Sequence, residues 1–198
     1  MNEATQVLVI LSQVAMGLSL AACAGLRAFL PMFVVGVGGR LDWIPLTSHF
    51  EWLATTPALI VFGAAVVAEL VADKVPWLDN VLDLVQSFVK PVAGVVAAAA
   101  VLHDLTPLQG TVLAIVLGAG AAGVVHAGKS TVRLASTAVT GGVANPVLSV
   151  AEEGGAWTLA LAAIWVPLIA AAVVLVLAVA AFLAVRRHRL RARDLRPA

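Results

Sequence analysis

Acidic and basic side chains lie within segments of this chain that are otherwise apolar. Glu69 and Asp73 are four residues apart in the apolar run 57–73, so a helix would place both on one face. An ionised carboxylate about 18 Å into such a helix is unfavourable unless it is paired, hydrated or protonated. Arg27 and Arg133 carry the opposite charge at the edges of other apolar runs. The pattern predicts either buried ion pairs or a site where the two acids bind a cation or proton, with the arginines as counter-charges.

Other polar residues extend this set. Lys74 directly follows Asp73. His126, Lys129 and Arg133 recur at steps of three and four, which places them on one face of a helix. We expect these groups in the cytoplasmic half of a membrane bundle. Asn145, which is expected at the outer end of the bundle, is added to this set. The candidate polar site then comprises Arg27, Glu69, Asp73, Lys74, His126, Lys129, Arg133 and Asn145.

The opposite, outer mouth is expected at a break in the second half of the chain. Asn145 stands before Pro146, and a residue before proline favours extended backbone. Glu152 and Glu153 follow within the same region. They belong either to a solvated loop or to a funnel that attracts ions.

The motifs of zinc proteases, of thiol redox enzymes and of serine hydrolases are absent from the sequence. No HExxH, CxxC or GxSxG pattern occurs, the four histidines are scattered, and Cys23 has no second thiol as partner. We therefore expect no catalytic residues, no cofactor and no metal centre.

The composition is that of a membrane protein. Of 198 residues, 62% are hydrophobic and only 12% charged, and the mean hydropathy is +1.04. A soluble domain is much less apolar, a disordered chain has more charge, and a disulfide scaffold needs more than one cysteine. The sequence predicts an all-α, polytopic membrane helix bundle in one domain, residues 1–185, followed by a basic cytoplasmic tail, 186–198.

Seven apolar segments are candidates to span the membrane. A span needs roughly 20 apolar residues, which residues 6–24, 57–73, 110–127 and 158–185 supply, the last being long enough to require tilt. Segments 25–39, 92–102 and 130–150 are marginal. If all seven cross, Arg40 is the only loop cation on the outer side, whereas five spans with re-entrant segments leave most loop cations outside. The positive-inside rule therefore favours about seven spans.

Glycine and proline interrupt two of the marginal segments, 25–39 and 130–150, at corresponding places in the two halves of the chain. The arrangement predicts a weak internal two-fold repeat of residues 6–74 and 110–185. Unwound helix at membrane depth exposes backbone groups that hold ions or substrate in transporters. The candidate hinges or breaks are Pro31, Gly38, Gly39, Gly141, Gly142 and Pro146.

Residues 77–90 are predicted to form an amphipathic helix at the interface. Trp77, Val81, Leu84, Val85 and Phe88 recur at helical spacing. The polar stripe of this helix consists of Asp79, Asp83, Gln86 and Lys90. This helix either caps the bundle or has a part in gating or docking.

The tail fixes the orientation. Residues 186–198 contain six arginines directly after an apolar segment, which indicates a cytoplasmic C-terminus able to contact anionic lipid headgroups. The N-terminus is then expected outside, without a cleaved signal peptide. The expected partners are the lipid bilayer and a second copy of the chain, and not nucleic acid.

Several ordered motifs resemble one family. They are GLRAFLP at 25–31, AELVADKVPWLDN at 68–80, VKPVAG at 89–94 and GGVANPVLSVAEE at 141–153. This series is similar to the bacterial integral-membrane family DUF4126, over roughly residues 10–175. The resemblance implies a multi-pass protein of the bacterial inner membrane and implies no substrate or reaction.

These observations lead to one functional expectation and one alternative. We expect a multi-pass membrane protein that transports, or forms a channel for, a small ion or solute. The alternative is a structural or scaffold membrane protein whose buried ion pairs orient helices and whose basic tail binds lipids or a partner.

Overall fold

The computed structural model describes residues 2–72 and 76–194, and their side chains apart from those of 76–84, 185 and 188–194. Within these ranges the chain is helical and forms no strand. Its elements are α1 (Glu3–Leu26), α2 (Leu30–Arg40), the 3-10 helix η1 (Ser48–Ala54), α3 (Thr56–Ala72), α4 (Pro76–Val101), α5 (Pro107–Thr140), α6 (Asn145–Trp165) and α7 (Pro167–Asp194).

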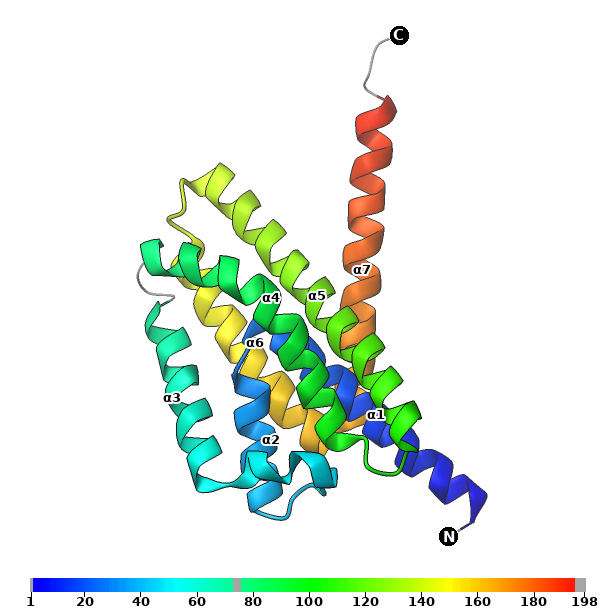
Figure 1. The fold of residues 1–198 in the computed structure, drawn as a ribbon. Helices are drawn as coiled ribbons and strands as arrows, with labels where there is room; N and C mark the ends of the chain where they lie inside the picture. Colours follow the sequence, from blue (N-terminus) through cyan, green and yellow to red (C-terminus); the bar gives the residue numbers. More distant parts are fainter. Residues whose placement is uncertain (1, 73–75, 195–198) are drawn as a thin grey trace.

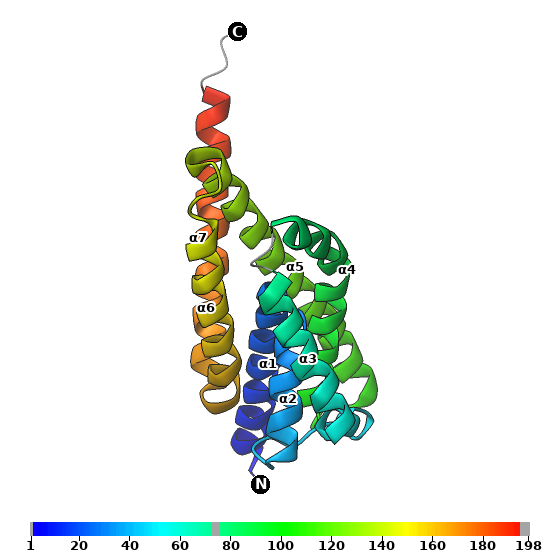
Figure 2. The same cartoon turned by 90° about the vertical axis from the view of Figure 1, so that its left-hand side faces the viewer.

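The helices form an up-and-down bundle in which successive α-helices run in opposite directions (Figure 1). α1, α4 and α5 pack closely at its centre. The view in Figure 2 places α6 and α7 on one side of α1, with α4 and α5 on the other. The end of α1, the α5–α6 turn and the end of α7 lie toward one end of the bundle, which we call the tail end (Figure 1).

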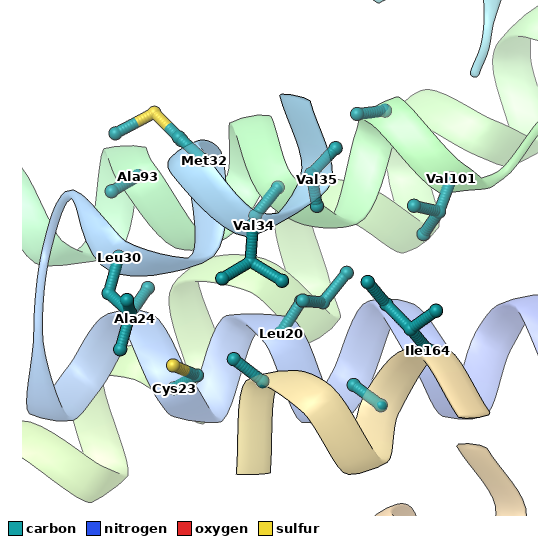
Figure 3. Close-up of a cluster of buried hydrophobic side chains, with 14 of the residues drawn as sticks. Leu20, Cys23, Ala24, Leu30, Met32, Val34, Val35, Ala93, Val101 and Ile164 are labelled. Carbon is teal, nitrogen blue, oxygen red and sulfur yellow. The ribbon is translucent and has the colours of Figure 1, made fainter. Parts of the chain in front are cut away.

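The core is built from aliphatic and small residues. Leu20 and Cys23 of α1, Val34 of α2 and Ile164 of α6 belong to one cluster of buried side chains (Figure 3). Where α4 crosses α5, a Cβ on Gly118 would lie only 2.5 Å from the Val95 Cα atom. Glycine is therefore needed at this crossing because the two backbones touch, as is common in membrane bundles.

The apolar helices support a membrane protein. Four of the described helices, α1, α5, α6 and α7, are long and apolar enough to cross a bilayer, or five if η1 and α3, bent by 66°, count as one span. Many large apolar side chains are exposed on the outside of the bundle, such as Ile60 on α3 and Val176 on α7. Exposure of these apolar side chains to water is unfavourable, whereas their contact with the hydrocarbon of a bilayer is not. The expected all-α membrane bundle is confirmed, while the exact count of seven spans stays a prediction.

Two predicted spans have different boundaries. Segment 130–150 does not form one element, because its first half continues α5 and its second half begins α6. The predicted span 158–185 is divided at Val166, the residue before Pro167, between α6 and α7. A residue before proline is disfavoured in the α region, which accounts for the second break.

The segment predicted as an interfacial helix belongs to a longer one. α4 passes through Pro91 and joins residues 77–90 to the apolar stretch 92–102. An interfacial helix turns its polar face to water, but Lys90 is fully buried while Phe88 is 76% exposed. At these positions the polar face of α4 points into the bundle, and the expectation of an interfacial surface is wrong there.

Candidate functional site

The site begins at the break between α1 and α2. α1 ends at Leu26, Arg27 adopts an extended backbone, and α2 starts at Leu30 with Pro31 in its first turn. The first backbone N–H groups of a helix have no partner within that helix. Those of Ala28 and Phe29 precede α2 and must find acceptors elsewhere in the bundle.

Glu69 of α3 supplies these acceptors. Its Oε1 accepts a hydrogen bond from the Ala28 nitrogen at 3.0 Å, and its Oε2 accepts one from Phe29 at 3.3 Å. The Gln86 amide of α4 donates a third hydrogen bond to Oε1 at 2.7 Å. Only 2% of Glu69 is exposed. One carboxylate therefore joins three separate elements at the helix break.

Two fixed cations act on the same carboxylate. Arg27 and Lys90 are both buried and both interact electrostatically with Glu69. Lys90 Nζ also lies 3.2 Å from His126 Nδ1 on α5, and Ser87 Oγ lies 3.1 Å from the other ring nitrogen. These polar side chains form a first cluster, which extends across the bundle from Glu69 on α3 to His126 on α5.

A second polar cluster lies beside the first. Arg133 Nη2 is 3.1 Å from Glu152 Oε2 and donates to Ser149 Oγ at 2.8 Å. Lys129 Nζ is 3.2 Å from the same Glu152 oxygen and 3.5 Å from the carbonyl oxygen of Leu26, which it can reach as a donor. Because Leu26 directly precedes Arg27, the end of α1 connects the two clusters.

The structure brings most of the predicted site residues together, but in two groups. Arg27 is near Glu69, as expected for a counter-charge, whereas Arg133 pairs with Glu152. The expectation that Glu152 lies at the opposite mouth from Arg133 is wrong, because the α5–α6 hairpin returns the chain to the same end. Asp73 and Lys74 lie outside the described residues.

Asn145 and the predicted breaks lie partly in the α5–α6 turn and partly inside helices. The Asn145 amide donates to Thr137 Oγ1 at 3.0 Å across the α5–α6 turn. In that turn Gly141 and Gly142 have φ of 63° and 88°, a conformation that favours glycine. Gly38 and Gly39 lie inside the last turns of α2, and Pro146 lies in the first turn of α6.

Sequence reasoning missed four members of the site. Gln86 and Lys90 were assigned to the polar stripe of an interfacial helix, and Ser87 and Ser149 were not singled out. Gln86 and Lys90 stand four residues apart on α4, opposite exposed apolar side chains. In a membrane protein the polar face of such a helix points into the bundle and the apolar face points to lipid. This rule could have identified Gln86 and Lys90 as site residues from the sequence.

The first cluster has the chemistry of an anion site. A helix N-terminus with free N–H groups binds negative charge, and here an amide and two cations supplement it. Carboxylate oxygens that already accept three hydrogen bonds, next to two cations, are poor ligands for a further cation. Within the part of the chain that the structure describes, no three His, Cys, Asp or Glu side chains are grouped to hold a metal ion.

Comparisons with known proteins identify the family and no closer relative. No curated protein and no solved structure matches the chain. Residues 14–187 match the family described as a domain of unknown function, DUF4126. The match covers most of the chain, including both polar clusters and all the candidate membrane spans in whole or in part. This protein therefore belongs to the DUF4126 family.

Proposed function

We propose that the protein transports a small anion across the membrane, and that the Glu69 carboxylate occupies the anion's place in this closed conformation. The observation that carries the proposal is the carboxylate itself, seated on the backbone N–H groups of Ala28 and Phe29 within an apolar bundle. A site that holds one carboxylate by these donors has the chemistry to hold a free anion.

The broken helix supports this role. Transporters place discontinuous helices at the substrate site, with the positive end of a half-helix directed at an anionic group. The α1–α2 break has this arrangement, since the N-terminus of α2 points at Glu69 and Arg27 lies within the break. Ionisable groups within a membrane bundle are rare because they are energetically unfavourable, and they commonly mark pathways.

α3 is the element best suited to open the site. Its described buried residues are Ala58, Val66 and Glu69, and most of its other side chains face outward. An element with few buried contacts separates from its neighbours at low free energy. If an entering anion displaces Glu69 from the α2 N-terminus, α3 loses its polar attachment to α2 and α4.

The second candidate is a structural role. The three hydrogen bonds of Glu69 reach α4 and the α1–α2 connection, so the carboxylate also holds these elements together. In that case the charges orient helices, nothing crosses the membrane, and substitutions change stability alone.

Flux through reconstituted vesicles separates the two candidates. Efflux of chloride, nitrate and phosphate is measured from proteoliposomes that contain the full chain. At least one anion should leave faster than from protein-free vesicles, and Arg27→Gln should abolish the difference. Glu69→Gln should increase flux, because it removes the charge of the internal competitor at nearly constant volume. Glu153→Gln is the control, since it removes a carboxylate next to the second cluster.

Folded yield and thermal unfolding of each variant are measured alongside. Rates equal to those of empty vesicles for all three anions would reject transport. So would a flux that Arg27→Gln leaves unchanged in a folded protein.

A further inference from the structure

A cleft on the outside of the bundle lies apart from the Glu69 site. Its volume is about 410 Å³, and α1, α5, α6 and α7 all contribute to its walls. The lining is aliphatic, with Leu26, Val132, Leu159 and Leu177 among its side chains, and Lys129 and Glu152 are its charged members. Small-molecule sites have this size and this combination of apolar walls with a few polar groups.

The cleft follows from helix divergence and from missing side chains. α5 and α6 are joined by a short turn but separate as they leave it, as both views show (Figures 1 and 2). Gly128 contributes no side chain to the wall, and a Cβ built there would meet no atom within 4 Å. The space therefore belongs to the backbone arrangement and is not closed by the packing of neighbouring residues.

With the arginine-rich tail in the cytoplasm, as the sequence predicts, the cleft lies at the depth of the inner half of the bilayer. α5 and α7 both begin at the end of the bundle opposite the tail, at Pro107 and Pro167 (Figure 1). A hydrocarbon core of about 30 Å takes roughly 20 helical residues. Counting from these starts leads to the neighbourhoods of Lys129 on α5 and Arg186 on α7. The charged end of the cleft is thus at headgroup level, and its aliphatic walls face hydrocarbon.

The charge at that end favours an anion. Lys129 and Arg133 share the carboxylate of Glu152. Arg186 and Arg187 are exposed on α7 near the same level. Positive charge next to an apolar cleft is complementary to a lipid that has an acyl chain and an anionic phosphate.

From the shape, depth and charge of this cleft we infer that it binds one acyl chain of an anionic phospholipid, with the lipid phosphate beside Lys129. The inference is independent of the proposed anion transport, because the cleft does not include Glu69. The occupant enters from the surrounding bilayer, and the exposed aliphatic wall at Val124 and Leu177 gives it a path.

Native mass spectrometry of the full chain in mild detergent tests the inference. The protein is titrated with phosphatidylglycerol and with phosphatidylcholine that has the same acyl chains. One phosphatidylglycerol molecule should bind about tenfold more tightly than phosphatidylcholine. Lys129→Gln should remove this preference, because the two lipids differ in the net charge of their headgroups.

Gly128→Leu separates the acyl contribution from the headgroup. Leucine at this position fills the cleft without a clash at Cβ, and it should weaken both lipids about tenfold. Gly123→Leu is the matched control, since a Cβ there also meets no atom within 4 Å and Gly123 does not line the cleft. Its lipid affinity should equal that of the parent protein.

Three results would overturn the inference. One is equal affinity of the parent protein for the two lipids. Another is unchanged binding in Gly128→Leu when circular dichroism shows that the variant is folded. The third is a protein dimer that Gly128→Leu abolishes, since a second copy of the chain would then be the occupant.

Discussion

Arg133 on α5 and Glu152 on α6 face each other across a helical hairpin, with Arg133 Nη2 3.1 Å from Glu152 Oε2. Lys129 approaches the same oxygen at 3.2 Å. One carboxylate thus pairs with two cations that are almost fully buried. The pair determines how α5 and α6 are aligned at the tail end, where the two helices otherwise diverge.

Loss of the Glu152 charge should destabilise the protein. Glu152→Gln leaves two buried cations without that carboxylate, and the free energy of unfolding should fall by about 3 kcal/mol. Denaturant unfolding in detergent, followed by circular dichroism, measures the change. Glu153→Gln at the neighbouring position should stay within about 0.5 kcal/mol. If Arg133→Gln in the Glu152→Gln background recovers no stability, the coupling between the two residues is refuted.

Small carboxylates should rescue a variant that lacks the Glu69 side chain. Glu69→Ala leaves the Ala28 and Phe29 N–H groups and the Gln86 amide without their acceptor, which lowers thermal stability. Added formate should raise the midpoint of thermal unfolding with concentration, because a ligand that binds only the folded state stabilises it. The parent protein, whose site is occupied by Glu69, should not respond. A formate effect of equal size in both proteins would contradict an anion site at this position.

Helix packing at the α4–α5 crossing should tolerate no added methyl group. Gly118→Ala places Cβ against the α4 backbone at Val95 and should lower the unfolding midpoint clearly. Gly120→Ala, two residues away, adds a Cβ with no atom within 4 Å and should be neutral or stabilising by up to about 1 kcal/mol. Thermal unfolding of the two variants makes the comparison. Equal effects of the two substitutions would show that the α4 and α5 backbones are farther apart at this crossing than in the structure.

Cys23 should not react with membrane-impermeant thiol reagents. Its side chain is fully buried in the core and its thiol donates to the Ala156 carbonyl at 3.3 Å. Labelling is measured by mass shift in intact cells, in inside-out vesicles and after denaturation in detergent. Modification is expected only after denaturation, and labelling of the folded protein from either side would show that water reaches this face of α1.

Cysteines introduced at the two ends should label from opposite sides. In a Cys23→Ala background, Val143→Cys lies in the exposed α5–α6 turn and Ser48→Cys lies in exposed η1. With the arginine-rich tail in the cytoplasm, Val143→Cys should react in inside-out vesicles and Ser48→Cys in intact cells. Reaction of both from one side would contradict the alternating arrangement of the bundle.

The sequence by itself determined the class of the protein and the identity of many polar site residues. High hydropathy with sparse charge is sufficient to predict a helical membrane bundle, because lipid requires every backbone group to be satisfied within the helix. Charges such as Glu69 and Arg27 were recognisable from the sequence because an ionisable residue within an apolar run is unfavourable without a partner. The glycine pair at 141–142 was predicted as a break within segment 130–150, and the structure has a turn there, where the left-handed backbone favours glycine.

Only the tertiary structure decided which charges meet. Helical periodicity gives the face of a residue on its own helix, but not the neighbour that the face contacts, so Gln86 and Lys90 were assigned to water. The partner of Arg133 depends on where α5 ends. The local sequence of residues 130–140 is compatible both with the continuation of α5 and with the start of a new span. Long-range packing settles both questions, because the free energy of burying a charge depends on which opposite charges and hydrogen-bond partners other helices bring within reach.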